Sequence, residues 1–177
     1  PQKDKAIEEG RNILENYELK KNDLSLENPQ IFYLKMQGGQ LIKVNSLSEA
    51  DFIKLGYQRY QLDEIEIVNS QNDKFPISLL LSGSNDAVKR ITELIYRYQI
   101  IDKDNFATYP LKTPAAAYDE LIKGNSQINN PGSEENKKTI RKIYLAYYDS
   151  LEIQTYLQPV YVFEGDHDFK AYVQAVS

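Results

Sequence analysis

The chain has 177 residues, 41% of them hydrophobic and 27% charged, as in an ordinary folded protein of one domain or two small units. Its 21 basic and 26 acidic residues give a net charge of -5 without a strongly basic run, which argues against nucleic acid as a partner. Cysteine is absent, which excludes disulfides and thiolate chemistry, and no apolar stretch is long enough to cross a bilayer.

The first predicted element is an amphipathic helix over residues 4–18. Apolar residues recur there at spacings of three and four and form one stripe: Ala6, Gly10, Ile13, Leu14 and Tyr17. A polar loop that ends at Pro29 separates this helix from the next element.

A tight hairpin is predicted next. Two strands flank Gly38 and Gly39, which supply the positive backbone angles of a two-residue turn and place Tyr33 opposite Val44. Both faces of this hairpin carry apolar residues, so we expect it to lie in a sheet that is at least partly covered on both sides.

Further strands are predicted up to residue 101. Ile53, Leu55 and Tyr57 alternate with polar residues and share one face, and the same period returns at residues 65–67. The run ISLLLS is a strand that follows Pro76. In residues 87–101 the alternation favours a long strand over a helix.

The second half begins with the clearest helix signals of the chain. Thr113 is the expected N-cap, Pro114 the first helical residue and Gly124 the left-handed stop, which gives a helix over residues 114–123. Its predicted buried stripe consists of Tyr118, Leu121 and Ile122. A polar loop, which holds at most one short strand, is expected over residues 125–138.

The C-terminal segment is predicted to be sheet. The run IRKIYLAYYDS has apolar residues on both alternating faces, as a central strand does. The runs QPVYVFE and DFKAYVQAV form a hairpin around Gly165, Asp166 and His167. The sequence therefore predicts an α+β fold, mostly β, of two helix-plus-antiparallel-sheet units that span residues 1–104 and 105–177.

The sequence offers few residues for chemistry. His167 is the only histidine and lies between Asp166 and Asp168, but alternation in a strand sends neighbours to different sides, so an exposed turn is favoured over a metal site. The acidic run that includes Glu64 and Glu66 is explained by an exposed strand face. Nucleophile and phosphate-loop motifs are absent. No catalytic residue, metal or cofactor is predicted.

Tyrosine is the more informative residue type. The chain has 14 Tyr, 6 Phe and no Trp, and tyrosines crowd the last three predicted strands. Alternation makes about half of them core residues, while outward ones can form a recognition surface, because Tyr is enriched at interfaces. The candidate binding residues are Tyr144, Tyr148, Tyr156, Tyr161 and Tyr172.

The second half also resembles a known family. The runs TPAAAYDELIKGN, IRKIYLAYYDS, YLQPVYVFEGD and FKAYVQAV, within residues 108–177, are similar to the extracytoplasmic regulatory domains of the YycH/YycI type of membrane-anchored bacterial proteins, and more distantly to PepSY-like units. The resemblance implies a domain outside the cytoplasmic membrane, tethered by a helix upstream of Pro1. It implies these recurrent positions: Leu121, Gly124, Leu145, Tyr147, Tyr148, Pro159, Tyr161, Phe163, Gly165, Tyr172, Val173 and Ala175.

Two functions remain open from the sequence. The first is a non-enzymatic extracytoplasmic module that binds a protein or peptide partner in a regulatory or envelope role, which missing catalytic motifs and abundant strand edges favour. The alternative is a small-ligand or glycan-binding domain, or a hydrolase that uses Glu64, Glu66 and Glu164 in a cleft between the two units.

Overall fold

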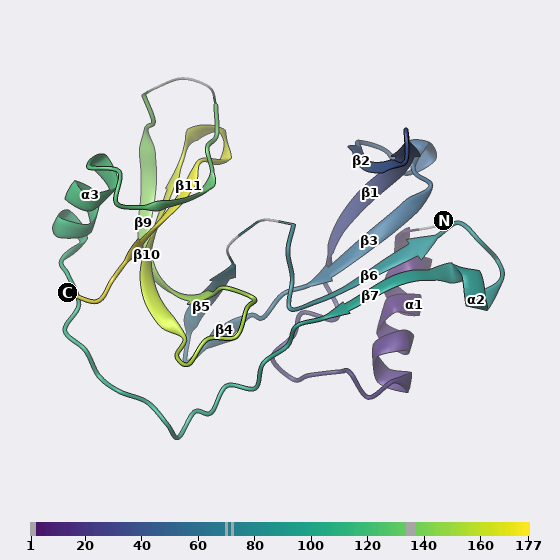
Figure 1. Ribbon diagram of the computed structural model, residues 1–177, viewed down its shortest axis with the longest axis horizontal. Coiled ribbons are helices and arrows are strands. Elements are labelled where there is room, and N and C mark those ends of the chain that lie inside the picture. Colours follow the sequence, from purple (N-terminus) through teal and green to yellow (C-terminus); the bar gives the residue numbers. More distant parts are fainter. Residues whose placement is uncertain (1–2, 70, 72, 134–136) are drawn as a thin grey trace. The chain divides into compact units, whose positions relative to one another are not determined.

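The computed structural model describes residues 3–69, 71, 73–133 and 137–177 (Figure 1). The fold is α+β and mostly β, as predicted, and the chain forms two compact units. The first unit comprises Pro1–Tyr60 and Lys74–Tyr98, and the second Gln61–Asp73 and Gln99–Ser177. The sequence had instead suggested one boundary after residue 104, with each unit continuous in the chain.

The first unit is a five-stranded antiparallel sheet with one long helix. Its strands follow the order β2-β1-β3-β6-β7. The elements are α1 (Lys3–Asn16), β1 (Gln30–Gln37), β2 (Gln40–Val44), the 3-10 helix η1 (Leu47–Glu49), β3 (Phe52–Tyr57), β6 (Ile77–Ser82), α2 (Ala87–Arg90) and β7 (Ile91–Tyr96).

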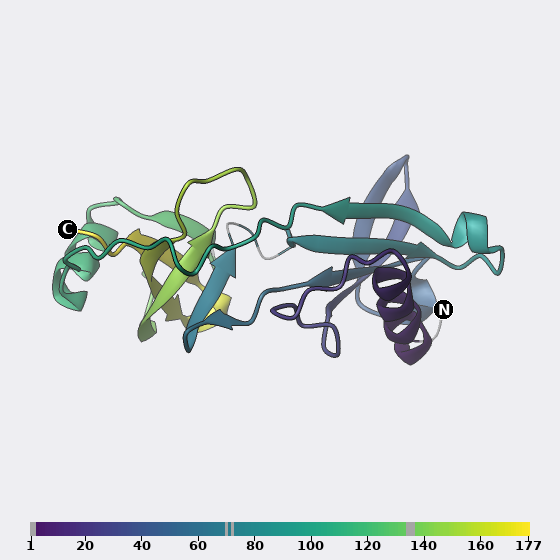
Figure 2. The same cartoon turned by 90° about the horizontal axis from the view of Figure 1, so that it is seen from below.

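Helix α1 lies against one face of this sheet (Figure 2). The predicted stripe supplies the buried Ala6, Ile13 and Leu14, although Tyr17 is exposed. The core under the helix also contains the fully buried sheet residues Ile53, Leu55, Tyr57, Ile77, Leu79 and Leu81. The prediction that alternating residues of β3 share one buried face is therefore confirmed.

A glycine lets α1 approach the sheet closely. A Cβ at Gly10 would lie 2.3 Å from Tyr57 Oη and 2.6 Å from Leu55 Cδ1, so any larger residue would force these neighbouring side chains to move. The hydroxyl of Tyr57 is buried under the helix and has no hydrogen-bond partner in the described part of the chain. Burial raises the pKa of Tyr57 far above its usual value.

The predicted hairpin is confirmed with its register, but the expectation that both of its faces are covered is wrong for β2, where Leu41 and Ile42 are exposed. Tyr33 pairs with Val44, and Gly38 and Gly39 have φ of 59° and 81°. The long strand predicted for residues 87–101 is only partly correct, because strand β7 ends at Tyr96 and α2 precedes it. Asp86 starts that short helix, since its carboxylate accepts a hydrogen bond from the Val88 amide at 3.0 Å.

The chain leaves the first unit after Tyr60 and after Tyr98, and both points lie close to the ion pair between Arg59 and Asp23. Arg59 is 3% exposed, and its Nε lies 3.3 Å from Asp23 Oδ2. The guanidinium stacks on the Tyr98 ring at 4.3 Å, and the Tyr98 hydroxyl donates to Asp23 Oδ1 at 2.8 Å. Burial and the Asp23 carboxylate together raise the pKa of Tyr98 to about 12. These contacts fix the chain where it departs at Tyr60 and Tyr98.

The second unit is a six-stranded mixed sheet with the order β4-β5-β9-β10-β11-β8. Strand β5 pairs with β9 in parallel, and the other pairs are antiparallel. The elements are β4 (Gln61–Leu62), β5 (Ile65–Asn69), α3 (Pro114–Ile122), β8 (Gln127–Asn130), β9 (Ile140–Asp149), β10 (Gln158–Gly165), the 3-10 helix η2 (Asp166–Asp168) and β11 (Lys170–Gln174).

The parallel pair explains why the two units interleave in the chain. β4 and β5 follow β3 directly, yet β5 aligns Ile67 with Tyr147 and Val68 with Tyr148 in the second sheet. Ile67 and Val68 are 2% and 4% exposed, so this strand belongs to the second core. Hydrophobic periodicity identifies a strand but does not identify its partner, so the sequence analysis left β5 with its neighbours in the chain.

Helix α3 begins and ends as predicted. The Thr113 hydroxyl accepts a hydrogen bond from the Ala116 amide at 3.2 Å, and Gly124 has φ of 82°. The predicted buried stripe is only partly correct, because Leu121 is partly buried and packs against the core, whereas Tyr118 and Ile122 are exposed. The fully buried residue of the helix is Ala117. The helix meets the sheet through its smallest side chain, which packs with a cluster of Tyr161, Phe163, Val173 and Ala175.

The C-terminal hairpin turns at residues 166–168, as predicted, but with a different geometry. His167 and Asp168 have positive φ, whereas Gly165 is extended. Glycine is required there because a Cβ would lie 2.5 Å from the Thr139 carbonyl oxygen. The His167 side chain is exposed. Strand β8 lies within the loop predicted for residues 125–138, of which residues 134–136 lie outside the described residues.

Among the residues that the structure describes, no helix combines the length and the apolar character that a membrane crossing requires.

Candidate functional site

The five candidate tyrosines separate into three environments. Tyr144, Tyr148 and Tyr172 pack together on the sheet face opposite α3. Tyr161 lies on the α3 face, where it is buried and donates a hydrogen bond to the Lys112 carbonyl at 2.8 Å. Tyr156 lies in the connection between β9 and β10 and is exposed. The structure thus brings three of the five residues together.

The sheet curls around this tyrosine face. Asn129 on β8 donates a hydrogen bond to the Asn69 carbonyl at the end of β5, at 3.1 Å. These strands are four positions apart in the sheet order, so the bond joins two distant strands across the face. The aromatic side chains fill the inside of the curl together with the buried Val68, Ala146, Val160 and Val162.

Charged groups surround the tyrosines on the same face. Glu164 accepts hydrogen bonds from the Tyr144 hydroxyl and the Lys170 ammonium, both at 2.9 Å. Lys142 lies over the Tyr144 ring, with its ammonium 4.2 Å from the ring centre. Burial, and next the Glu164 hydrogen bond, raise the pKa of Tyr144, while burial followed by Tyr148 raises the pKa of Tyr172.

Within the tyrosine cluster, the Tyr144 hydroxyl is bound to Glu164, and this carboxylate is in turn held by Lys170. Partial burial by itself raises the pKa of Glu164, but the hydrogen bonds from Lys170 and Tyr144 outweigh it and hold this pKa below its usual value. A carboxylate that is held ionised by an ammonium and a phenol is a poor general acid. With Tyr172 5% exposed, the arrangement is one of packing and internal hydrogen bonds.

The other two candidate acids differ in their placement. Glu64 lies in the turn between β4 and β5 with φ of 67°. The Glu66 side chain on β5 is exposed, but it lies near enough to the tyrosine cluster that its charge contributes, after burial, to the raised pKa of Tyr144 and of Tyr172. Within the described ranges, no three His, Asp or Glu side chains converge as metal ligands would.

Strand β7 forms an open edge of the first sheet. The Arg97 amide donates to the Pro76 carbonyl at 2.7 Å, so alternation turns the backbone N–H and C=O groups of Leu94 and Tyr96 away from β6. The side chains of these two residues are 37% and 39% exposed. Among the described residues, these backbone groups have no hydrogen-bond partner, so the edge offers free donors and acceptors next to apolar side chains.

A second open feature is a groove of about 750 Å³ beside α1. One wall is α1, and the other is the turn from β6 into α2. It is lined by Lys5, Glu8, Glu9, Asn12, Ile13, Asn16, Gly83, Ser84, Asn85 and Arg90.

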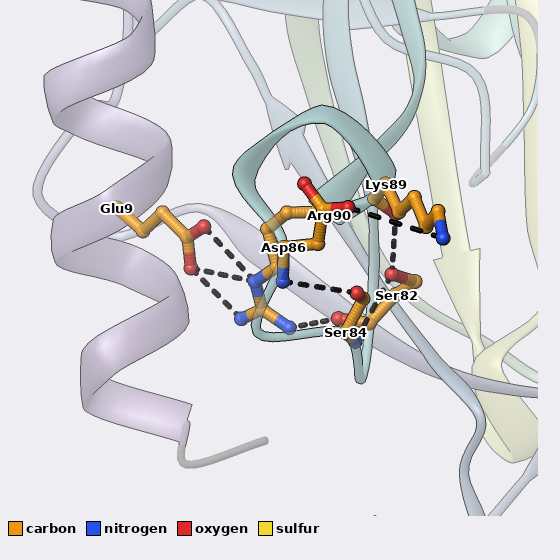
Figure 3. A network of polar contacts seen from close by, with 6 residues as sticks. All are labelled: Glu9, Ser82, Ser84, Asp86, Lys89 and Arg90. Atoms are coloured by element: carbon orange, nitrogen blue, oxygen red, sulfur yellow. Dashed lines mark hydrogen bonds and ion pairs between the residues drawn. The ribbon is translucent and has the colours of Figure 1, made fainter.

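A polar network holds the two walls of this groove together (Figure 3). Arg90 Nε donates to both carboxylate oxygens of Glu9 at 2.9 Å, and its Nη2 lies 2.8 Å from Glu9 Oε2. The remaining Nη1 donates to the Ser82 carbonyl oxygen. Because this guanidinium is buried and bound on all sides, it fixes α1 against the end of β6.

The turn itself is stiffened by hydroxyl and carboxylate hydrogen bonds. Ser82 Oγ donates to the Lys89 carbonyl at 2.7 Å and accepts from the Ser84 amide at 3.2 Å. Ser84 Oγ accepts from the Asp86 amide at 3.1 Å. Short polar side chains that bond to nearby backbone groups keep a turn in one conformation. The turn that forms this wall of the groove therefore has a defined backbone conformation without a ligand.

Sequence reasoning missed the groove, although its elements were individually visible. The run SGSND combines Gly with Ser, Asn and Asp at the end of a predicted strand, and Glu9 lies outside the apolar stripe of the first predicted helix. The ion pair between Glu9 and Arg90 joins residues 81 positions apart, and no local periodicity reports such a contact. The only signal was the unusual density of Asn, Ser and Asp at a strand end.

The comparisons with known proteins add no homologue. No family model matches the chain, and no curated protein or solved structure is significantly similar to it.

Proposed function

We propose that this chain is a non-enzymatic module that binds a protein or peptide partner by adding a strand of that partner to β7. The observation that carries the proposal is the open edge of β7, with outward backbone groups at Leu94 and Tyr96. In strand addition, main-chain hydrogen bonds supply affinity and the flanking side chains supply specificity.

Strand β7 suits this role better than the opposite edge of the same sheet. Edge strands avoid unwanted pairing through Lys or Pro side chains and through short length. Strand β2 carries Lys43, whose ammonium lies 4.9 Å from the centre of the Phe32 ring. Strand β7 has neither Lys nor Pro between Ile91 and Tyr96. In the second unit, the edge strands β4 and β8 are only two and four residues long.

The location belongs to the same proposal. We infer a module on the outer side of a bacterial cell membrane, in a regulatory or envelope role, attached through an anchor upstream of Pro1. This part rests on the resemblance of residues 108–177 to the YycH/YycI-type domains. The runs that carry that resemblance build α3, β9, β10 and β11, which all lie in the second unit.

The edge can be blocked without disturbing the sheet. Leu94→Pro removes an amide that points away from β6, and Pro is tolerated on an edge strand when its missing donor faces solvent. The matched control Leu94→Ala loses the side chain and keeps the amide. We expect the full chain and the Leu94→Ala variant to retain the same envelope proteins from a bacterial membrane extract, and Leu94→Pro to lose at least ten-fold of that binding.

Amide hydrogen exchange locates the contact. With the retained partner bound, the amides of Leu94 and Tyr96 are expected to exchange more slowly, while those of the β2 edge remain unchanged. Equal retention by the Leu94→Pro variant, with no slowing in β7, would refute partner binding at this edge.

A further inference from the structure

Strand β9 is only partly paired on one of its two sides. Along β10 it is paired from Ile140 to Tyr148. On the other side, β5 pairs only with Tyr147, Tyr148 and Asp149, although β9 has ten residues. Residues 140–146 therefore border a gap in the second sheet, which we call the β9 gap, and no strand among the described residues pairs with β9 there.

The backbone of two residues in the middle of β9 points into this gap. The Pro159 carbonyl of β10 accepts a hydrogen bond at 3.0 Å from the residue that follows β11, so residues of β10 face β11 and β9 in turn, starting from Pro159. Val162 accordingly faces β9, and its partner Tyr144 faces β10. The neighbours of Tyr144, Ile143 and Leu145, direct their N–H and C=O groups into the β9 gap, where no described strand binds them.

Strand β5 closes one end of the β9 gap. Its first residues, Ile65 and Glu66, pair with β4 and not with β9, and its pairing with β9 begins at Tyr147. A strand in the gap is therefore in line with β5 and has to end or turn away before Tyr147. A second copy of β9 fits poorly, because its chain continues in both directions and would run into β5.

The side chains beside the gap are apolar on both faces of the sheet. On the face that α3 covers, Ile143 is 41% exposed, and Leu145 is partly buried against the core. On the opposite face, Tyr144 packs within the tyrosine cluster and Ala146 is fully buried. A strand added here would cover apolar surface in addition to binding the free backbone groups.

The two basic residues at the other end do not block the gap. A Lys side chain on an edge strand normally discourages pairing. The Arg141 guanidinium, however, donates two hydrogen bonds to the Asp166 carboxylate, at 2.7 and 2.8 Å. The Lys142 ammonium lies 4.2 Å from the centre of the Tyr144 ring. Both cations are thus held by groups of the same unit.

We propose that the β9 gap binds a short strand of a partner protein or peptide, which continues the line of β5 and completes the second sheet. An extended backbone is the ligand that matches alternating free N–H and C=O groups. Two alternate side chains of the added strand are apolar and lie beside Ile143 and Leu145. A basic residue of the partner faces Glu66, whose exposed carboxylate lies at the closed end of the gap. This site does not depend on the β7 edge and extends the proposed binding function to the second unit.

A displayed library of linear ten-residue peptides, selected on the immobilised full chain, provides the probe. Selected peptides are expected to carry two apolar residues separated by one position, with a Lys or Arg beyond them. Ile143→Pro removes an amide that faces the gap, and an edge strand tolerates Pro at such a position. It should weaken binding of a selected synthetic peptide about ten-fold relative to Ile143→Ala, the matched control that keeps the amide. Glu66→Gln should reduce the dependence of this binding on salt.

Disulfide trapping tests the same contact without a proline in the strand. The chain has no cysteine, so Ile143→Cys places a single thiol beside the gap. A selected peptide with Cys in place of one of its apolar residues should form a disulfide with this variant in a glutathione redox buffer. Ile128→Cys, on the edge strand β8, is the control, because Ile128 is 47% exposed and lies outside the gap. Equal trapping at both positions would overturn binding in the gap.

The outcomes separate this site from the β7 edge. Peptides that lose affinity in Leu94→Pro but not in Ile143→Pro would overturn the β9 gap as a binding site and leave the edge intact. The reverse pattern, together with slower exchange of the Ile143 and Leu145 amides in the bound protein, would support the gap and refute the edge as the peptide site. Peptides that bind both proline variants as tightly as the full chain would overturn both sites.

Discussion

At the scale of single residues, polar groups in the second unit are held by charge as much as by packing. Glu164 is the clearest example, since it joins the Tyr144 hydroxyl and the Lys170 ammonium on the inside of a curled sheet. Its lowered pKa is a statement about stability, because the folded state prefers the ionised carboxylate more than the unfolded state does.

This preference predicts how the second unit responds to acid. A group with a lowered folded pKa contributes stability above its ordinary pKa of 4.5, and this contribution is lost as the pH falls through the folded value. At pH 7, Glu164→Gln should lower the free energy of unfolding by about 1 kcal/mol, the low end for a hydrogen bond to a charged, partly solvated group. Urea unfolding between pH 7 and pH 3 measures this difference.

The difference between the two proteins should shrink steadily below pH 4.5. A gap that stays constant down to pH 3 would show that the ionised carboxylate contributes nothing. Asp168→Asn, at an exposed turn residue on the same hairpin, serves as the control for a general change in charge.

At the scale of secondary-structure elements, the main determinant is how closely each helix approaches its sheet. Both helices use a small residue at the contact, Gly10 in α1 and Ala117 in α3. Because the larger apolar residues flank the contact, they either fill the edges of the core or remain exposed. This explains why Tyr118 and Ile122 are exposed although their spacing resembles a buried stripe.

The close contact at Gly10 predicts that Ala at this position destabilises the protein, whereas helix propensity alone predicts that it stabilises it. Gly10→Ala should lower the free energy of unfolding by about 1–3 kcal/mol, because the added methyl group meets Tyr57 Oη, although Ala favours a helix by about 1 kcal/mol over Gly. Chemical denaturation of the full chain measures the change. Asn12→Ala, at an exposed position of the same helix, is expected to be neutral or stabilising.

A second substitution identifies the cause. Tyr57→Phe removes the hydroxyl that has no hydrogen-bond partner among the described residues, and in the Gly10→Ala background it should restore part of the lost stability. If the two effects simply add, the proposed clash is not the reason for the loss.

Turn and capping residues predicted individual elements well, but they do not predict contacts between residues far apart in the sequence. The Gly38–Gly39 turn gave the hairpin register, and Thr113 with Gly124 gave both ends of α3, since each depends on a few adjacent residues. The partner of β5 and the groove beside α1 depend on pairs such as Ile67 with Tyr147 and Glu9 with Arg90. A single sequence has no period that encodes these pairs.

At the scale of the whole molecule, the second unit is incomplete without a segment that the chain supplies from within the first. Strand β5 covers the edge of β9, and its Ile67 and Val68 are buried in the second core. Without it, residues of a ten-residue central strand become an unpaired apolar edge.

Fragments test this dependence. Residues 99–177 alone should show no cooperative unfolding transition, whereas the same fragment with residues 61–73 joined to its N-terminus through a flexible Gly/Ser linker should unfold cooperatively. Circular dichroism during thermal unfolding distinguishes the two. A scrambled 61–73 segment on the same linker is the control. Cooperative unfolding of residues 99–177 by themselves would show that β5 is dispensable.

The interleaved order of the two units also changes what a protease can do. The chain passes between the units at three points, after Tyr60, after Asp73 and after Tyr98. After a cut behind Tyr60 or Asp73, the two fragments remain paired through β3 and β6 of the first sheet. After a cut behind Tyr98, the C-terminal fragment remains paired with β5 through β9. A single cut that would release a terminal domain from a chain of consecutive domains therefore leaves both units held together here.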